Sequence, residues 1–263
     1  MRTRPAAVAG LFYADDPAVL KADVVAYLSA ASCPMASPPK ALIVPHAGLV
    51  YSGPIAGTAY RCLQSVADAI QRVVLLGPAH RVGIRGVAAP TVDAFETPLG
   101  PVNIDQRAVD TLLALPHVHR RDDVHAQEHS LEVQLPFLQH LLSDFELVPL
   151  VVGHASHEEV AAVLELLWGG PETLILISSD LSHFHDYATA RALDTATAKS
   201  IVELEPAGLH HDAACGRIPV GGLIRVAKRR RLRATLLDLR NSGDTAGTRD
   251  RVVGYGAFAF HTP

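Results

Sequence analysis

The stretch "TLILISSDLSHF", residues 173–184, begins with an apolar run and ends in a polar one. No polar residue interrupts the "LILI" of this run. A strand of this kind is expected to be buried on both faces, as strands are at the centre of a mainly parallel sheet. The run "VVLL" in "RVVLLGPAH", residues 72–80, has the same pattern. Two such strands predict an α/β fold.

The rest of the chain alternates strand and helix patterns. Short apolar or β-branched runs predict further strands over residues 41–45, 146–152, 232–239 and 252–260. Helical patterns lie between them, and neither a linker nor a repeat interrupts the chain. We therefore expect one domain over residues 1–263, with a central, mainly parallel or mixed sheet and helices on both faces.

The ends of several predicted helices carry capping signals. Asp16 precedes a helix with Pro17 at its first position, and Ser156 with Glu159 predicts a capping box. In "EHSLEVQLPFLQHLL" the leucines form a helical stripe, with a kink expected at Pro136. The basic run "KRRRLR", residues 228–233, is expected to end a helix rather than to bind phosphates.

Composition excludes several classes of protein. Of the 263 residues, 49% are hydrophobic and 19% are charged, which is typical of a folded protein and not of a disordered one. The formal net charge of −4 gives no field that would attract nucleic acid or an acidic lipid surface. No segment reaches the roughly 18 apolar residues of a membrane helix. We therefore expect neither nucleic acid nor a membrane as a partner.

The three cysteines, Cys33, Cys62 and Cys215, bear on the compartment and on metal binding. An odd number without a CxxC pair is typical of a reducing compartment, and argues against a disulfide framework or a thiolate zinc site. The N-terminal "MRTRPAAVAGLFYA" resembles a short signal peptide, but Pro5 interrupts it and no cleavage site follows. The sequence therefore predicts a cytoplasmic protein. Cys215 could be a small buried side chain or a reactive thiol, and we expect the former.

Polar residues follow three of the predicted strands. His46 stands between Pro45 and a turn of small residues, His80 follows "RVVLLGPA", and Asp180 and His183 follow "LILIS". Ligands of open α/β sheets bind beyond the carboxyl ends of the strands, so these residues are expected to meet. Neutral imidazoles are ligands for zinc, iron and copper, and two of them need a third protein ligand. His46 and His80 are the predicted metal ligands.

Structural roles compete for the remaining candidates. Asp180 could cap a helix and leave His183 in solvent, or it could orient His183 as a general acid–base group. Glu128 and Glu132 could complement a helix dipole, or Glu128 and His129 could line the cleft at the strand ends. Asp244, in "NSGDTAG", could build a turn or supply the carboxylate that completes a two-histidine site.

Ordered motifs along the whole chain resemble one family. The chain is identified as a member of the Memo-like family, whose bacterial and archaeal members are called AmmeMemoRadiSam system protein B, on "RPAAVAGLFY", "PHAGLVYSG", "GPAH", "ETPLG", "EHSLEVQLPFL", "SSDLSHF", "ACG" and "NSGD…VVGYGAFAF". The match extends from Arg4 to Phe260. It implies a fold similar to that of the class III extradiol dioxygenases, non-haem iron enzymes that cleave catechol rings.

The resemblance also implies roles for individual residues. In those dioxygenases two histidines and a glutamate hold ferrous iron, and another histidine is the acid–base group. His46 and His80 match the metal histidines and His183 the acid–base group, with Asp180 beside it as an orienting residue. The loop before the final strand, where the dioxygenases offer the glutamate and animal Memo proteins a cysteine, has neither here. Asp244 is the candidate in that loop, and two histidines with one carboxylate suit ferrous iron.

Two hypotheses about function follow. The first is a redox enzyme with Fe(II), or else copper, on His46, His80 and Asp244, and with a pocket that Glu128 and His129 shape. Zinc is a further metal that these ligands could hold. The second is a binding module for a peptide or anion without turnover, since animal relatives are described as adaptors for phosphotyrosine peptides. The family name also implies a radical S-adenosylmethionine protein and a small partner-domain protein as partners. This chain has no CxxxCxxC cluster motif of its own.

Overall fold

The computed structural model describes residues 1–263, and its centre is a block of four parallel strands. They are β2 (Ala41–Val44), β9 (Thr173–Ser178), β3 (Arg72–Pro78) and β8 (Glu146–Val152), paired in that spatial order. Nearly every residue in them is buried, as the uninterrupted apolar runs predict. Because β2 and β3 both flank β9, their carboxyl ends lie at the same edge of the sheet.

Antiparallel strands extend this block and make the sheet mixed. On the β2 side, β12 (Val252–His261) pairs with β2, and both β11 (Arg233–Asn241) and β10 (His183–His185) pair with β12. On the β8 side, β4 (Val87–Ala89) is antiparallel to β8, and β7 (Val118–Arg120) is parallel to β4. A separate small sheet contains β1 (Thr3–Arg4), β5 (Ala94–Thr97) and β6 (Gly100–Asn103).

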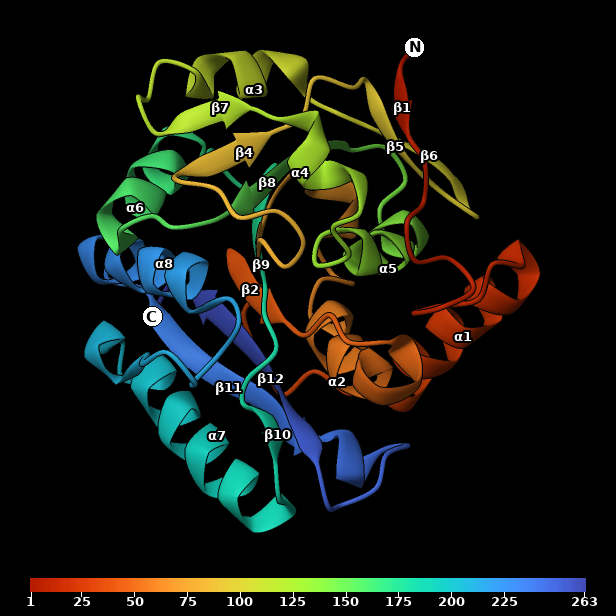
Figure 1. The fold of residues 1–263 in the computed structure, drawn as a ribbon, viewed down its shortest axis with the longest axis vertical. Coiled ribbons are helices and arrows are strands. Elements are labelled where there is room, and N and C mark those ends of the chain that lie inside the picture. Colours follow the sequence, from red (N-terminus) through yellow and green to blue (C-terminus); the bar gives the residue numbers. More distant parts are fainter.

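Helices cover both faces of the large sheet, as Figure 1 shows. One group comprises α1 (Pro17–Ala30), α2 (Leu49–Arg61) and α5 (Leu135–Leu141), and the other comprises α6 (His157–Leu166), α7 (Tyr187–Val202) and α8 (Arg217–Arg229). The short helices are α3 (Gln106–Leu112), α4 (Asp122–Ala126) and the 3₁₀ turns η1 (Ala67–Ala69), η2 (Glu132–Gln134), η3 (Pro206–Gly208) and η4 (Ser242–Asp244). The predicted α/β fold is confirmed.

Two predicted helix starts are confirmed, whereas the kink predicted at Pro136 and the turn predicted after His46 are wrong. Asp16 accepts hydrogen bonds from the first turn of α1, and Ser156 with Glu159 forms the predicted capping box of α6. Pro136 does not kink a long helix, because α5 begins beside it after the 3₁₀ turn η2. The segment expected to be a turn after His46 is helix α2, which accommodates Pro54.

A disulfide joins Cys33 to Cys62, so the expectation that the chain has no such bond is wrong. Cys33 follows the end of α1 and Cys62 ends α2. These two helices pack together and place the two Cα atoms 5.0 Å apart. The count of cysteines could not reveal this contact, because it depends on how α1 crosses α2.

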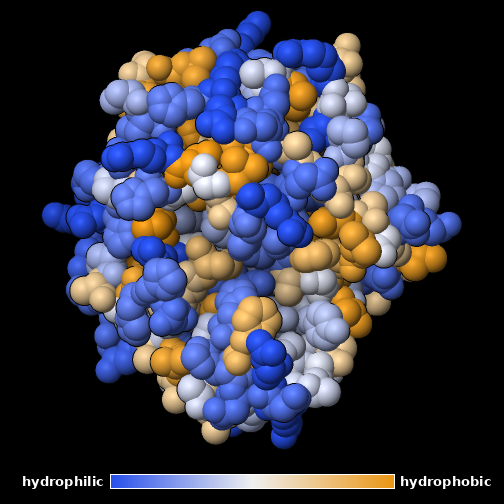
Figure 2. Space-filling model, viewed as in Figure 1, coloured by the Kyte–Doolittle hydropathy of each residue, from blue (hydrophilic) through white to orange (hydrophobic).

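The surface shows no dominant apolar region on the face drawn in Figure 2, where apolar residues lie in small groups among polar ones. No helix has both the length and the apolar character needed to cross a membrane. Beneath the surface, one contiguous hydrophobic core contains 67 buried residues, which hold the strand ends in place.

Candidate functional site

Two histidines meet at the carboxyl edge of the parallel strands. His46 lies two residues after β2 and His80 two residues after β3, and their ring centroids are 5.2 Å apart. Their positions follow from the topology, since both strands are neighbours of β9. The His46 side chain is buried, whereas 27% of the His80 side chain is exposed.

Hydrogen bonds define the tautomer of His46. Its Nδ1 lies 2.8 Å from Ser178 Oγ, at the end of β9. The Ser178 hydroxyl donates its only proton to the carbonyl of Ser130 at 2.5 Å and accepts one from the Gln134 amide at 2.8 Å. Ser178 can therefore only accept from His46, so Nδ1 carries the proton and Nε2 has a free lone pair. Burial and the nearby His80 lower the pKa of His46 well below its usual value, which favours this neutral form.

His80 is held in the same tautomer by a carboxylate. Glu128 accepts hydrogen bonds from the His80 backbone N at 2.6 Å and from His80 Nδ1 at 2.9 Å. Burial opposes the ionisation of Glu128, but the hydrogen bonds from His80 and Ser130 outweigh it and lower its pKa to about 2. An ionised Glu128 can only accept, so His80 Nδ1 donates and its Nε2 lone pair is free.

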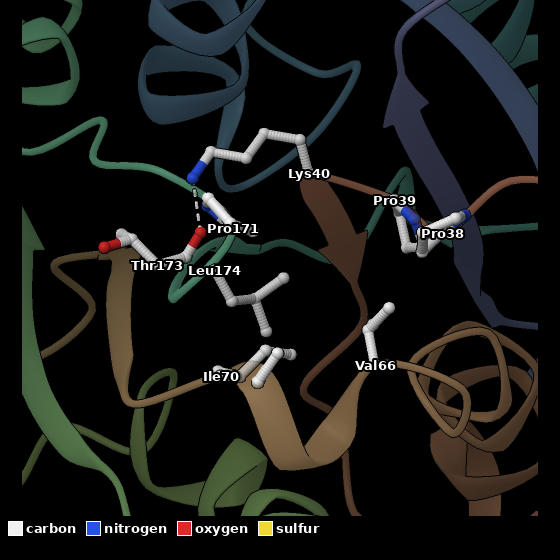
Figure 3. Close-up of a pocket in the computed structure, with 9 residues that line it drawn as sticks. Pro38, Pro39, Lys40, Val66, Ile70, Pro171, Thr173 and Leu174 are labelled. Atoms are coloured by element: carbon white, nitrogen blue, oxygen red, sulfur yellow. Dashed lines mark hydrogen bonds between the residues drawn. The ribbon is translucent and has the colours of Figure 1, made fainter.

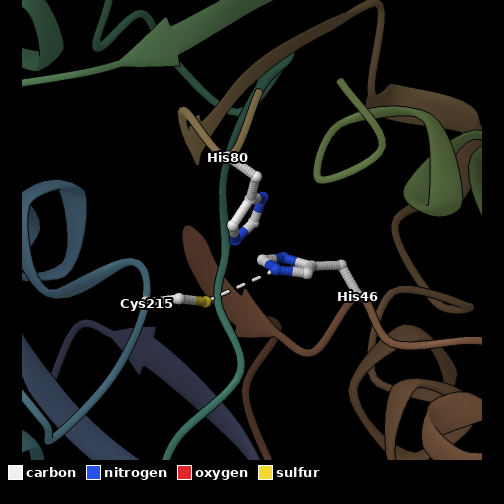
Figure 4. A group of neighbouring side chains, drawn as sticks. All are labelled: His46, His80 and Cys215. Atoms are coloured by element: carbon white, nitrogen blue, oxygen red, sulfur yellow. Dashed lines mark hydrogen bonds between the residues drawn. The ribbon is translucent and has the colours of Figure 1, made fainter. Parts of the chain in front are cut away.

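The third member of this cluster is Cys215, as Figure 4 shows. Its Sγ lies 3.4 Å from His46 Nε2, and the ligand atoms of His46, His80 and Cys215 all lie within 4.8 Å of one another. Cys215 is held there by the Asp180 backbone N, which donates to Sγ at 3.3 Å. The close approach requires Gly216, because a Cβ at that position would lie 2.5 Å from Ser179 Cβ.

Asp244, the predicted third ligand, does not join the two histidines. It lies in η4, where its carboxylate accepts hydrogen bonds from the Tyr187 hydroxyl at 2.6 Å and from the Asn241 backbone N at 3.1 Å. It belongs neither to this cluster nor to the second group of closely spaced ligand atoms, which contains His80, Glu128 and His129. The Asp244 carboxylate completes the capping box of η4, whose N-cap is Asn241, so it builds the turn before β12.

Asp180 positions the backbone of the site. It is buried, and its Oδ1 accepts a hydrogen bond from the His46 backbone N at 2.7 Å. Burial raises the pKa of Asp180, while His183 and the backbone donors oppose this rise. Asp180 caps no helix, because the N-cap of α7 is Asp186.

His183 and His129 complete the polar surroundings of the cluster. His183 Nδ1 donates to the Leu181 carbonyl at 2.8 Å, so this carbonyl orients the ring, and its Nε2 is free in the neutral form. The His129 ring stacks on His80 with centroids 4.6 Å apart. Burial lowers the pKa of His129 to about 4, and its Nδ1 has no hydrogen-bond partner. Glu128 and His129 thus both contact His80 beside the cluster.

Comparisons with known proteins agree with the sequence motifs. A family model described as Memo-like protein matches residues 4–259. This chain belongs to the Memo-like family. A MEMO1 family protein of Ignicoccus hospitalis is 36% identical over 100% of both chains, and one of Aquifex aeolicus is 34% identical over 99% of this chain and 100% of its own. An uncharacterised protein of Escherichia coli K12 has a similar fold, with a TM-score of 0.51 and 14% identity over 82% of this chain and 98% of that one.

In this Memo-like chain, sequence reasoning missed Cys215 as a member of the cluster. Cys215 is 169 residues from His46 and precedes α8, not a strand end. The motif "ACG" was one signal that could have found it, since a cysteine before a helix start, followed by glycine, can approach another loop closely. The cluster itself comes from the two strand ends and the loop before α8.

A cavity at the opposite edge of the sheet has a structural explanation. Pro38, Lys40, Ile70 and Thr173 help to line it, near the amino ends of β2, β3 and β9 (Figure 3). Lys40 Nζ donates to the carbonyls of Gly170 and Thr173, so its charge is used to fasten two loops. Burial lowers the pKa of Lys40 to about 8. Ligands of parallel sheets bind at the other edge, where the histidines are.

Proposed function

We propose that this Memo-like protein binds a redox-active transition metal through His46, His80 and Cys215. The observation that carries the proposal is the common orientation of three donors. Both imidazoles have Nδ1 committed to a hydrogen bond and Nε2 free. Cys215 Sγ lies 3.4 Å from His46 Nε2, and one ligand atom of each of the three residues lies within 4.8 Å of the others. Metal-binding histidines usually have this arrangement, with the second ring nitrogen bound to a carboxylate or another acceptor.

The donor set fits the redox-active metals iron and copper, and it would also hold zinc, which has no redox chemistry of its own. Cys215 replaces the carboxylate of the expected set, and a thiolate favours copper and zinc more than a carboxylate does. Burial raises the pKa of the Cys215 thiol, but a bound cation reverses this effect, because coordinating thiols lose their proton. When bound, iron or copper would supply redox chemistry and would polarise a substrate oxygen.

The surrounding residues have separate tasks under this proposal. Ser178 and Glu128 fix the two imidazole rings, and Asp180 fixes the backbone of His46. His183 is the proton-transfer group, because its Nδ1 is bound to a carbonyl and its Nε2 is free to accept a proton. The partly exposed side of His80 leaves an approach for a substrate.

Elemental analysis tests the ligand set. The protein is purified without a metal-affinity tag, reconstituted anaerobically with ferrous or cuprous ion, and compared with His46→Ala, Cys215→Ser and Asp244→Asn. We expect near-stoichiometric metal in the wild type and in Asp244→Asn, and loss of metal in the other two variants. Circular dichroism checks that each variant is folded. Retention of metal by a folded Cys215→Ser protein, together with its loss in Asp244→Asn, would reverse the assignment.

A further inference from the structure

A cavity opens beside the three-residue cluster. Cys215 forms part of its wall, together with Ala79 from the loop that carries His80, Gly153 and His154 after β8, and Arg217 at the start of α8. The ionisable residues of this wall are His154, Cys215 and Arg217, and it contains no Asp or Glu. The approach to the cluster is therefore lined by cationic and neutral groups.

Arg217 is the unexplained residue of this wall. Its side chain is partly buried, yet it makes no ion pair and no hydrogen bond within the protein. The later arginines of the same helix are paired: Arg225 and Arg229 contact Glu158. An unpaired, partly desolvated guanidinium is unfavourable, and the positive end of a helix dipole makes it more so. Arg217 is the first residue of α8, so nothing in the fold itself accounts for a cation there.

The lining of arginine and histidine side chains continues into a second cavity. The two cavities share His154 and Ala155, and the second adds Arg85, His117 and His119. Its one carboxylate belongs to Glu159, which accepts hydrogen bonds from the Ser156 backbone N at 2.7 Å and from the Ser156 hydroxyl at 2.9 Å. Two arginines, Arg217 and Arg85, and three histidines, His117, His119 and His154, thus line the two cavities from the side of Cys215 to the start of α6.

We infer that this cavity binds the oxyanion of a substrate, a carboxylate or a phosphate, and that Arg217 pairs with it while the rest of the substrate faces the cluster of His46, His80 and Cys215. The substrate class rests on the proposed metal function, but the oxyanion site can be tested separately. A guanidinium binds either oxyanion through two parallel hydrogen bonds, and the N-terminus of α8 favours the same negative charge. A neutral analogue would leave Arg217 unpaired.

Calorimetric titration with simple probes tests the site. Benzoate, inorganic phosphate and the neutral benzamide are titrated into metal-reconstituted and chelator-treated protein. Arg217→Gln is compared with wild type, and Arg225→Gln is the matched control, because it removes an arginine of the same helix that pairs outside the cavity. Metal content is measured on every sample.

We expect wild type and Arg225→Gln to bind benzoate and to discriminate against benzamide, and Arg217→Gln to bind benzoate about 10- to 100-fold more weakly, the usual effect of a charge-assisted pair. Unchanged benzoate affinity in a folded Arg217→Gln protein overturns the inference. So does the absence of binding by both anions at millimolar concentration, even if metal binds as proposed. Arg217-dependent binding to a protein that takes up no metal would refute the metal assignment and leave the oxyanion site standing.

Discussion

At the scale of single residues, the site depends on which nitrogen of each imidazole is occupied. Ser178 and Glu128 hydrogen-bond to Nδ1 of His46 and of His80, so they determine where the lone pairs of these two rings point. Such partners usually change metal affinity by 10- to 100-fold when they are removed. The orientation of the two imidazole rings therefore depends on Ser178 in β9 and on Glu128 in the segment before η2.

The Glu128→Gln substitution tests this dependence. One amide oxygen would replace a carboxylate that now accepts from the His80 backbone, His80 Nδ1 and the Ser130 backbone, so His80 would lose its charged acceptor. We expect metal affinity to fall about 10- to 100-fold, measured by competition with a chelator of known affinity. Asp244→Asn is the control and should bind metal as wild type does. An unchanged affinity in Glu128→Gln would mean that His80 is not oriented through this carboxylate.

The sequence identifies some residues of the cluster and not others for a physical reason. His46 and His80 could be found because each directly follows a buried strand, and strand ends converge at one edge of a sheet. The third donor had to come from a loop, and three-dimensional contacts alone decide which loop returns to that edge. Asp244 was the closest match by residue type, yet η4 uses its carboxylate and Cys215 occupies the place beside His46.

At the scale of elements, the α1–α2 pair also shows that local features can be predicted from the sequence and three-dimensional contacts cannot. The N-cap of α1 is local and could be predicted, whereas α2 contains Gly53, Pro54 and Gly57 and looks like a loop in the sequence. Packing explains the glycines, because a Cβ at Gly57 would lie 2.7 Å from the Tyr27 carbonyl oxygen of α1. The packing of α2 against α1 therefore stabilises a helix whose own residues have low helix propensity.

The disulfide at the end of this helix pair should stabilise the fold. It closes a loop with a sequence separation of 29 residues, for which chain entropy alone gives about 3–4 kcal/mol. We expect the Cys33→Ser, Cys62→Ser double variant to unfold at lower urea concentration than the oxidised wild type. Reductant should bring the wild type down to the same midpoint and leave the variant unchanged. A wild type whose midpoint does not respond to reductant would contradict this role.

At the scale of the whole molecule, the first residues of the chain support the site near its middle. Arg4 in β1 pairs with the buried Glu132 at 2.5 Å and donates to the backbone carbonyls of His125 and Glu128. Glu132 also accepts from the backbone N of Ala7 at 2.8 Å. The N-terminal segment that resembles a signal peptide is thus bonded into the fold and holds the segment that orients His80.

Removing the ion pair between Arg4 and Glu132 should lower the stability of the fold. In Glu132→Gln the charge of Arg4 would remain buried without its partner, and we expect a loss of about 3 kcal/mol in the free energy of unfolding. Urea denaturation at neutral pH measures it. The matched control is Glu158→Gln on the surface, where Arg225 and Arg229 remain solvated, and its midpoint should match that of wild type. Equal midpoints for both variants would show that the Arg4 link is not required for stability.

His125 should make the whole fold sensitive to acid. It is buried, its Nε2 donates to the Ala88 carbonyl, and its Nδ1 has no partner that could accept a second proton. Burial lowers its pKa from 6.5 to about 4, with a further lowering by Arg4 that Asp122 and Glu128 oppose. Between these two pH values the unfolded chain binds a proton that the native state does not. Stability is therefore complete above pH 6.5 and falls as the pH drops toward 4, by about 3 kcal/mol for the full shift.

The His125→Gln variant separates this contribution from the rest of the acid response. Glutamine can still donate to the Ala88 carbonyl but does not titrate. We expect the difference in unfolding free energy between pH 7 and pH 4 to shrink by about 3 kcal/mol, even if the variant is less stable than wild type at pH 7. His210→Gln at an exposed position is the control and should leave the acid slope unchanged. An acid slope in His125→Gln as steep as in wild type would place the acid sensitivity in other groups, first among them the buried His46 and the partly buried His129.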